Sequence, residues 1–343
     1  MDFGVDLSAL EHVQDQGFPP LVPDRVANID ADFIAYIVAC DTKAELAGEK
    51  PARSLEHKVA QVREFTEFIR KKAGADRAIL HITPSESNKG RRAEYVMQAA
   101  YQGNRIGRET PNDLKFIRDF MIQECNAKAW YDREADDGLT MSQYANPHNS
   151  IICSSDKDLL MVPGYHLDMK TWEITNCPWD TFGRVFIGDG KMRGYGPKFF
   201  FAQCLAGDTA DNIKGLPGIS RKRVLFEKPT AKFTKAKELY HKYKETKPEK
   251  AKVKLEEIKA MLDGYNKVGD TTAVSVVQYL NNGYEAYLFI RELFREYKHF
   301  TNYRTGEPIT PDQALHGDMI ALWMRRTDNK FDVFEYIKEE RDK

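Results

Sequence analysis

Short apolar runs and amphipathic stretches alternate along the first half of the chain. Three apolar runs bounded by polar residues predict buried strands over residues 25–30, 78–82 and 150–154. Helical spacing of apolar residues, together with helix-start signals, predicts helices over 55–72, 111–124 and 134–145, with a helix or turn over 33–40. Strands alternating with helices predict an α/β domain with a mostly parallel central sheet flanked by helices.

The second half of the chain follows a different pattern. Hairpins are predicted over 164–175 and 184–193, and helices over 197–205, 228–259 and, as a pair broken at Asn281-Asn-Gly283, 270–299. We therefore expect an N-terminal extension (1–24), an α/β core (25–200), a helical region (201–300) with a Lys-rich insertion (228–268), and a C-terminal extension (301–343).

The composition is that of a folded globular protein, because 42% of the 343 residues are hydrophobic and 11% are aromatic. The five cysteines form no C-x-x-C pair, which argues against a zinc site or a disulfide framework and favours the cytoplasm. The first residues lack the pattern of a signal peptide, and the apolar run 33–40 is too short to span a bilayer. We therefore expect no membrane partner.

The formal net charge of −1 hides a local asymmetry. Residues 221–259 contain fourteen Lys or Arg against six Glu. An acidic site with a basic flank suits a phosphate-backbone ligand whose scissile phosphate lies on metal. A solvated helix is the plainer interpretation of the Lys-rich run, and we favour it there over contact with DNA.

Carboxylates gather where strands end and helices begin. Ligands of parallel sheets bind outside the carboxyl ends of the strands, so acids from three segments could converge there. Packed carboxylates repel one another, and their usual neutraliser is Mg²⁺ or Mn²⁺. This pattern indicates a metal-dependent phosphodiesterase. The acids are Asp30, Glu134, Asp136, Asp137, Asp156 and Asp158.

Plainer roles compete with metal binding at these positions. Acids at 134–137 also favour the dipole of a helix start, and Asp156, Asp158 and Asp208 are suitable helix caps. Three acidic groups in one chain favour the metal site over these separate explanations.

The most specific stretch is 207–220. Asp208 and Asp211 are three residues apart, so on a helical turn they would share a face and could reach the same metal site. The glycine turn Lys214-Gly-Leu-Pro-Gly218 exposes backbone N–H groups and precedes Arg221-Lys-Arg223. Such donors and cations hold a phosphate backbone without reading bases.

Four motifs in order resemble the 5′-nuclease superfamily of flap endonucleases and 5′→3′ exonucleases, and most of all its bacteriophage members. They are Val26-Ala-Asn-Ile-Asp30, Glu134-Ala-Asp-Asp137, Ser154-Ser-Asp-Lys-Asp158 and the stretch from Gly207 to Ile219. The resemblance covers about residues 25 to 225. It implies a PIN-like nuclease core, a helical arch at about 88–126, and a helix–three-turn–helix region that grips duplex DNA.

The resemblance further implies hydrolysis of DNA with two Mg²⁺ (or Mn²⁺) ions, and K⁺ at the glycine turn. The implied partners are DNA with a 5′ end or 5′ flap, an RNA–DNA hybrid, and phage replication proteins in the host cytoplasm. The implied role is phage DNA replication with RNA primer removal, or DNA degradation.

The implied site divides into metal ligands, catalytic residues and DNA contacts. We assign the first metal to Asp30, Glu134, Asp136 and Asp156, and the second to Asp158, Asp208 and Asp211 with Asp137 near it. Catalytic roles fall to Asp136, Arg91, Arg92 and Arg105, with Tyr95 and Tyr101 on the arch, although surface charge and ordinary packing are the plainer alternatives. DNA contacts are assigned to Tyr101, Arg105, Lys214, Gly215, Gly218, Ser220, Arg221, Lys222 and Arg223.

Two positions depart from the family pattern. Members usually carry an aspartate after the second strand, where this chain has Thr83-Pro84, with Glu86 as a candidate replacement. Members also carry a lysine where this chain has Gln102, and Arg91, Arg92 or Arg105 could replace its charge.

Three other functions compete with the nuclease. Asp30-Ala-Asp32 also resembles the D-x-D of haloacid-dehalogenase-type phosphatases, which have no use for a glycine turn with a basic tail. The two departures keep open a DNA-end binding protein that has lost catalysis. An RNase of the related PIN-like fold is the third alternative, because backbone contacts carry little sequence information.

Overall fold

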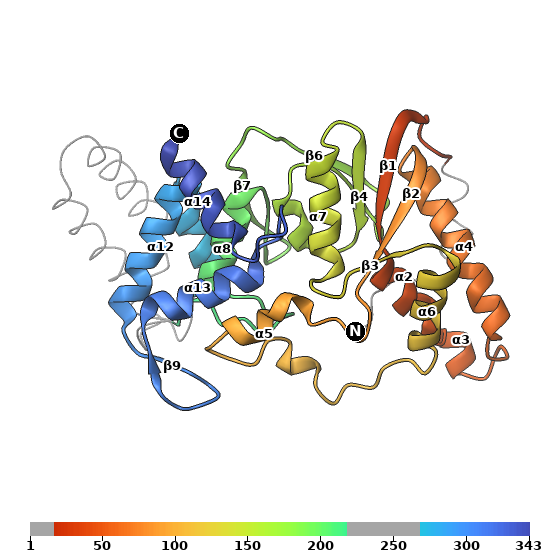
Figure 1. Cartoon of the computed structure of the whole chain (residues 1–343), viewed down its shortest axis with the longest axis horizontal. Coiled ribbons are helices and arrows are strands. Elements are labelled where there is room, and N and C mark those ends of the chain that lie inside the picture. The colour runs from red at the N-terminus through yellow and green to blue at the C-terminus, as the bar shows by residue number, and fades with distance from the viewer. Residues whose placement is uncertain (1–16, 218–267) are drawn as a thin grey trace. The chain divides into compact units, whose positions relative to one another are not determined.

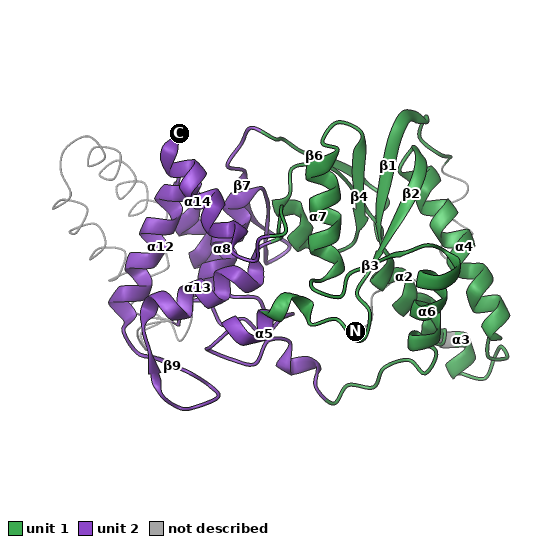
Figure 2. Ribbon diagram, viewed as in Figure 1, with its two compact units in different colours: residues 1–91, 107–179, 324–328 green, residues 92–106, 180–323, 329–343 purple. Residues whose placement is uncertain are grey.

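The structure is a computed structural model that describes residues 17–217 and 268–343, and it divides into two compact units (Figure 1, Figure 2). Unit 1 comprises residues 1–91, 107–179 and 324–328, and unit 2 comprises 92–106, 180–323 and 329–343. This division differs from the domains expected from sequence. Residues 92–106 and 180–200 group with unit 2, and the short segment 324–328 returns to unit 1.

Unit 1 is built on a six-stranded sheet with the strand order β3-β2-β1-β4-β5-β6. The first five strands in this order are parallel to their neighbours, and β6 is antiparallel to β5. The predicted fold class, a mostly parallel sheet flanked by helices, is therefore confirmed. The strands are β1 (Val22–Asp30), β2 (Ala75–Ile82), β3 (Lys128–Ala129), β4 (Ser150–Ser154), β5 (Gly164–Asp168) and β6 (Ile174–Cys177).

Helices cover both faces of this sheet, with α4 and α6 on one side and α7 on the other (Figure 1). Helix α4 begins where Ser54 caps it by accepting a hydrogen bond from the His57 amide, and it ends in a basic turn that suits the helix dipole. Its buried stripe of Val62, Phe65 and Ile69 packs into the core beside the sheet. The helices are α2 (Ala31–Ala39), α3 (Lys43–Leu46), α4 (Leu55–Lys72), α6 (Leu114–Glu124) and α7 (Ala135–Ala145), with 3-10 turns η2 (Lys89–Arg91) and η4 (Lys157–Met161).

Unit 2 combines a hairpin with a group of helices. The hairpin turns at the predicted Gly188–Gly190, and the two helices predicted within 270–299 are present on either side of Asn281 and Asn282. Helix α12 packs against α8, α13 and α14. The elements are β7 (Arg184–Gly188), β8 (Lys191–Tyr195), β9 (Phe300–Thr301), β10 (Pro308–Ile309), α5 (Arg92–Tyr95), η3 (Gly103–Arg105), α8 (Pro197–Ala206), α11 (Asp270–Val277), α12 (Gly283–Tyr297), α13 (Pro311–Leu322) and α14 (Asp332–Asp342).

Two sequence expectations need comment here. The helix expected over 228–259 lies outside the described residues. Residues 301–343, expected only as an extension, contain α13 and α14, and both helices bury side chains in unit 2. Helix α13 begins with a capping box formed by Thr310 and Gln313, with Pro311 in its first turn.

A buried carboxyl group makes the stability of unit 2 depend on pH. Asp318 on α13 is fully buried, and burial raises its pKa to about 8 despite hydrogen bonds from Gly215 and Gln98. The folded protein therefore binds a proton that the unfolded chain has lost over most of the range between about pH 4 and pH 8. The free energy of unfolding must fall as the pH rises through this range.

We predict that the Asp318→Asn variant loses this part of the pH dependence. The wild-type free energy of unfolding should fall by up to about 1.4 kcal/mol per pH unit between pH 5 and pH 8, relative to the variant. Denaturant unfolding at several pH values measures this pH dependence of the free energy of unfolding. Replacement of the exposed Asp189 by Asn is the matched control. Parallel pH profiles for Asp318→Asn and wild type would refute the assignment.

Candidate active site

The acids of three segments converge on Asp136, in the first turn of α7. Burial raises the pKa of Asp136 well above its usual range, and the charges of Asp156, Asp30, Glu134 and Asp137 raise it further, in that order. The predicted convergence is therefore present in unit 1. Carboxylates held this close favour a shared proton or a bound cation.

Asp30 is held in place at both oxygens. It ends β1 and caps α2, with Oδ1 accepting a hydrogen bond from the Phe33 amide at 3.1 Å. Its Oδ2 accepts a hydrogen bond from the Ser154 hydroxyl at 2.9 Å. Burial, and then the charge of Asp32, raise the pKa of Asp30 to about 6. Ser154 thus orients a site carboxylate from the neighbouring strand end.

The two acids after β4 have unequal surroundings. Asp156 is exposed, and its Oδ1 caps η4 by accepting a hydrogen bond from the Asp158 amide at 2.9 Å, so the capping role is present. Asp158 is buried, and its Oδ1 accepts a hydrogen bond from Lys157 Nζ at 2.6 Å. Only Asp156 of the two is among the main charges that raise the pKa of Asp136.

Asp137 is bound to Arg325, from the segment 324–328 of unit 1. Its fully buried carboxylate accepts a hydrogen bond from the Arg325 amide at 3.0 Å, and the Arg325 Nε lies 3.8 Å from the other oxygen. Arg325 Nη2 also donates to the Gly90 carbonyl at 2.9 Å. The sequence expectation placed Asp137 near a metal, but the contacts give this carboxylate a buried arginine partner.

The segment 324–328 also supports the start of α7 in a second way. Asp328 forms an ion pair with Arg133 at 2.8 Å, one residue before Glu134. Gly90 has a positive φ of 67°, and a Cβ there would lie 2.1 Å from Arg325 Nη2. No local sequence signal links residues 90, 133 and 325, so these supporting residues were missed.

Thr83 has a structural role in place of the family aspartate. Its hydroxyl accepts a hydrogen bond from the Ala135 amide at 2.9 Å, which caps the first turn of α7. Its own amide donates to Asp32 Oδ2 at 3.0 Å, and Arg118 Nη2 donates to Asp32 Oδ1 at 2.9 Å. The carboxylate at the end of β2 is therefore that of Asp32. Glu86, the expected replacement, is exposed.

Asp32 was missed as a site residue, although the Asp30-Ala-Asp32 pattern contained the signal. A residue two places after a strand-end acid, at the start of a helix, can point back to the same sheet edge. From the sequence, Asp32 was interpreted only as part of the D-x-D pattern of a competing phosphatase class.

Asp208 and Asp211 do not lie on a helical turn, so that expectation is wrong. Asp208 and Ile213 form an antiparallel bridge, with N–H···O distances of 2.9 and 2.8 Å, which closes residues 208–213 into a tight loop of unit 2. Asp208 is buried, and its Oδ1 accepts a hydrogen bond from the Ala210 amide at 2.9 Å. Their assignment to a second metal stays a prediction.

Asp211 binds the residues expected on the arch. Its carboxylate accepts hydrogen bonds from Tyr101 (3.2 Å), Gln102 (3.1 Å) and Arg105 (2.8 Å), all within unit 2. The neutral amide of Gln102 therefore has a defined acidic partner. Arg105 is neutralised by Asp211 in this arrangement, and its catalytic assignment stays a prediction.

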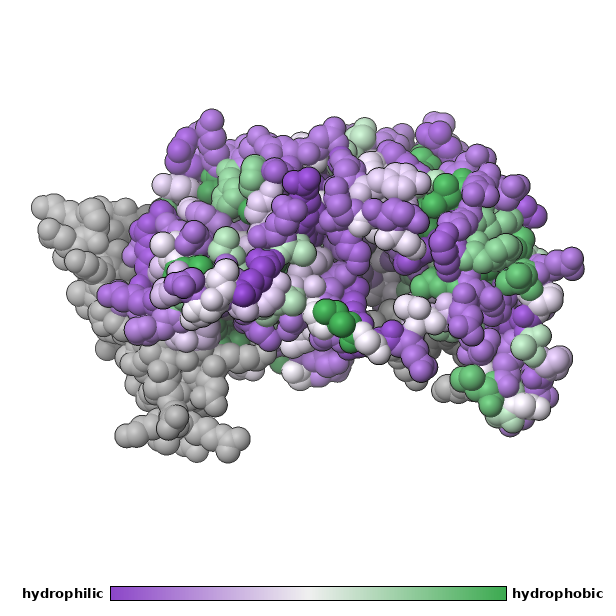
Figure 3. Space-filling view, turned by 60° about the horizontal axis from the view of Figure 1, so that its bottom comes forward, coloured by the Kyte–Doolittle hydropathy of each residue, from purple (hydrophilic) through white to green (hydrophobic). Residues whose placement is uncertain are grey.

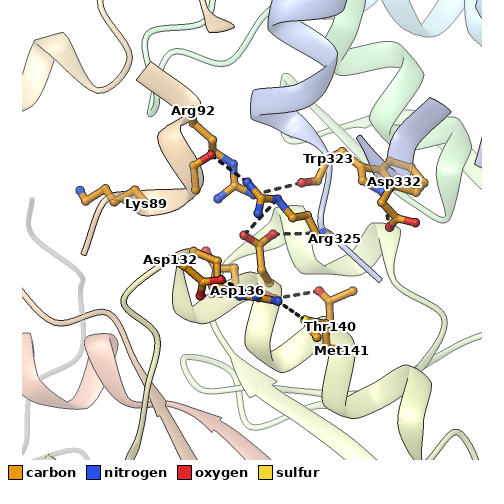
Figure 4. Close-up of polar contacts among 12 residues, drawn as sticks. Lys89, Arg92, Asp132, Asp136, Thr140, Met141, Trp323, Arg325 and Asp332 are labelled. Carbon is orange, nitrogen blue, oxygen red and sulfur yellow. Dashed lines mark hydrogen bonds and ion pairs between the residues drawn. The ribbon is translucent and has the colours of Figure 1, made fainter. Parts of the chain in front are cut away.

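Arg92 is not placed to line a passage for DNA. It is 1% exposed, and its Nη2 donates to the Trp323 carbonyl at 3.0 Å (Figure 4). The expectation that Arg92 lines the arch is therefore wrong for this arrangement, because a buried guanidinium cannot meet a strand. Arg91 is exposed, and Tyr95 packs against Phe331 with ring centroids 5.7 Å apart.

The glycine turn is only partly described. Lys214 is exposed, as a phosphate contact requires. Gly215 is buried, and its amide donates to Asp318 Oδ2 at 3.1 Å, so the expected exposed donor at this position is wrong. The other predicted DNA contacts, Gly218, Ser220, Arg221, Lys222 and Arg223, lie outside the described residues.

The acids of unit 1 fit a hard divalent cation. Over residues 17–217 and 268–343, no three Asp, Glu, His or Cys side chains form a ready-made metal site. Carboxylate oxygens are the donors that Mg²⁺ and Mn²⁺ prefer, so the donor chemistry of Asp30, Glu134, Asp136 and Asp156 suits such an ion. Their assignment as metal ligands stays a prediction.

Comparisons with known proteins found similarity to solved structures alone. No family model and no curated protein matches the chain. Among solved structures, it is similar to the bacteriophage T5 D15 protein crystallised with metal ions, at 13% identity and a TM-score of 0.40 over 93% of this chain and 98% of that one. It is also similar to the T5 flap endonuclease in a pseudo-enzyme-product complex with DNA and metal ions, at 12% identity, a TM-score of 0.40, and coverage of 92% and 99%.

A third similar structure is that of a T5 5′-exonuclease mutant, at 13% identity and a TM-score of 0.39 over 93% of this chain and 98% of that one. At this identity and TM-score the functional argument rests on the residues of the chain itself.

Figure 3 shows a mostly hydrophilic face on which hydrophobic side chains form small, separate areas. Among the described residues, no helix combines the length and the hydrophobicity needed to cross a membrane.

We predict that replacing Arg325 by Met destabilises unit 1. The change removes the Arg325 guanidinium from beside the fully buried Asp137 carboxylate, which should lower the free energy of unfolding by roughly 3–5 kcal/mol. Denaturant unfolding measures the loss, with exposed Arg341→Met as the control. The double variant Arg325→Met/Asp137→Leu should recover most of the stability. If the single variant Arg325→Met and the double variant lose the same free energy of unfolding, the Asp137–Arg325 pair is not the cause.

We also predict that Asp32→Asn lowers the pKa of Asp30. The charge of Asp32 is the second cause, after burial, that raises this pKa to about 6, and the amide removes it. Carboxyl-detected NMR titration of the metal-free protein measures the change. An unchanged Asp30 titration, beside an Asp41→Asn control, would place Asp32 outside the cluster.

Proposed function

We propose that the protein is a Mg²⁺-dependent 5′→3′ exonuclease or flap endonuclease that hydrolyses phosphodiester bonds of DNA. The observation that carries the proposal is the convergence of Asp30, Glu134 and Asp156 on Asp136, at the carboxyl edge of a parallel sheet. Such a concentration of negative charge repels a phosphodiester unless cations intervene, so the arrangement suits metal-assisted hydrolysis better than direct binding of DNA.

Divalent cations bound by such carboxylates supply activation of a water molecule and stabilisation of the leaving oxygen. The residues of the chain fix the ligands. Ser154 and the Phe33 amide hold the two oxygens of Asp30, and Thr83 caps the helix that presents Asp136. Arg325 holds Asp137 and, through it, the first turn of α7.

Within unit 2, the exposed Lys214 and the basic run 221–223 support a duplex-binding role, because they are positioned near one another in sequence and bind backbone rather than bases. The second metal ion that the sequence resemblance assigned to Asp158, Asp208 and Asp211 stays a sequence prediction, because Asp158 belongs to unit 1 and the two others belong to unit 2. The proposal also includes K⁺ at the glycine turn and RNA–DNA hybrids as substrates. It further includes a role in phage replication and a cytoplasmic location.

The phosphatase alternative is less well supported. In that class the first aspartate of D-x-D attacks phosphorus, and the class has no use for a glycine turn with a basic tail such as this chain carries over residues 214–223. The second aspartate of the pattern, Asp32, is engaged by Thr83 and Arg118.

We predict that Asp136→Asn abolishes Mg²⁺-dependent cleavage. Release of nucleotides from a 5′-labelled duplex and a 5′-flap substrate should fall by at least about 100-fold, because a central ligand is lost. Calorimetric titration with Mn²⁺ should show weaker binding in the same variant. Asp119→Asn, on the exposed side of α6, is the matched control and should behave as wild type.

The result separates the alternatives. Cleavage that requires Mg²⁺ and disappears in Asp136→Asn supports the nuclease, and the product lengths distinguish exonuclease from flap cutting. Salt-sensitive DNA binding by wild type without any cleavage would instead indicate the non-catalytic DNA-end binding protein.

A further inference from the structure

The loop that contains the glycine turn is held in one shape by its own backbone. We call residues 207–217 the glycine loop. The Asp208–Ile213 bridge closes its first part, and the Leu216 amide donates to the Leu205 carbonyl at 2.9 Å. Gly215 has a φ of +65°, and a Cβ there would lie 2.4 Å from the Gly207 nitrogen. Only glycine fits where the two ends of the loop meet.

Two side chains from distant parts of unit 2 bind the Gly215 peptides. Asp318 Oδ2, from α13, accepts the hydrogen bond of the Gly215 amide at 3.1 Å. Gln98 Nε2 donates to the Gly215 carbonyl at 3.2 Å and to the same Asp318 oxygen at 2.8 Å. Both polar backbone groups of Gly215 are therefore bound by side chains more than 100 residues away in the sequence.

This arrangement is costly for stability. Asp318 is fully buried, and its Oδ1 has no hydrogen-bond partner among the described residues. An apolar side chain at this place would avoid the desolvation of a carboxyl group. The only hydrogen bonds that the structure gives the Asp318 carboxyl group, within the described residues, are those to Gly215 and Gln98. The buried Asp318 carboxyl group lowers stability, and its hydrogen bonds hold the Gly215 peptide either directly or through Gln98. We infer that the position of the Gly215 peptide is required for function.

The residue next to the held peptide is the exposed Lys214. Its Nζ donates to Asn212 Oδ1 at 3.0 Å, and Asn212 Nδ2 donates to the Ala100 carbonyl at 2.8 Å. The backbone of Lys214 is thus fixed on its C-terminal side by Gly215, and its side chain is guided by Asn212. A pre-positioned cation loses less conformational entropy when it binds a phosphate than a free one does.

We propose that Gln98 and Asp318 are positioning residues, which fix the Gly215 peptide so that Lys214 is aimed at a phosphate of the nucleic-acid backbone. The inference rests on the proposed function and adds to it residues that no sequence motif contains. It also gives a role to the C-terminal region, since α13 supplies Asp318.

The test is steady-state kinetics of the full chain on a 5′-labelled duplex with Mg²⁺. Asp318→Leu removes the acceptor of both hydrogen bonds, and we expect KM to rise about tenfold with kcat at saturating DNA unchanged. Asp318→Asn retains an oxygen that can accept both bonds, so this conservative change should restore most of the affinity. Glu285→Leu is the matched control: it removes another buried acid of unit 2, on α12, and should leave KM unchanged.

A double-variant cycle separates positioning from general destabilisation. Lys214→Gln should raise KM and reduce the slope of log KM against log salt by about one, as the loss of a phosphate contact does. If Asp318 acts through Lys214, the double variant Asp318→Leu/Lys214→Gln should be little worse than either single variant. Multiplied losses in the double variant would overturn the proposal.

Two further results would test the positioning role of Asp318 and Gln98. If Asp318→Leu does not fold, as judged by its thermal transition, Gln98→Leu tests the same clamp and should raise KM. Folded variants with wild-type KM overturn the positioning role alone, because wild-type cleavage still supports the nuclease. A wild-type protein that neither binds nor cuts DNA overturns the proposed function and this inference together.

Discussion

Electrostatic repulsion among carboxylates at one edge of the sheet is the constraint around which unit 1 is arranged. Asp136 lies among four other acids, and burial makes its charged form still less favourable. Three of these neighbours accept a defined hydrogen bond: Asp30 from the Ser154 hydroxyl, Asp137 from the Arg325 amide and Asp156 from the Asp158 amide. The acids therefore stay together because the fold restrains them individually, which is the preorganisation that a site for cations requires.

Two buried acids, Asp137 and Asp318, have surroundings that do not stabilise the fold. The Asp137–Arg325 pair is buried, and pairs of this kind stabilise a protein less than well-packed apolar residues would. Asp318 in unit 2 is a buried acid with one oxygen that forms no hydrogen bond within the described residues. Both acids hold a backbone segment beside proposed functional residues. Costs of this kind are typical of functional sites, where position matters more than stability.

The two departures from the family pattern have physical explanations within their own units. Thr83 replaces a carboxylate with a hydroxyl that caps α7, and Asp32 places a carboxylate at the same strand end. Gln102 replaces a lysine with an amide that donates to Asp211 and to the Tyr101 hydroxyl. In both cases a changed side chain is matched by a partner elsewhere in the sequence, so the departures do not by themselves indicate a loss of function.

The sequence by itself determined strands β1, β2 and β4 and helices α4, α6 and α7, because hydrophobic periodicity is local, whereas the short β3 and α3 were not predicted. It also indicated that Asp30, Asp136 and Asp156 gather at one edge of the sheet, since acids that end parallel strands or begin the helices after them meet there. Only the tertiary structure decided that Asp137 binds Arg325, that Asp208 and Asp211 lie on a bridged loop, and that Arg92 is buried. The contacts of Asp137 with Arg325 and of Arg92 with Trp323 join groups far apart in the sequence, and neither spacing nor composition encodes that choice. The Asp208–Ile213 bridge is local, but the three-residue spacing of the two acids suits a helical turn equally well.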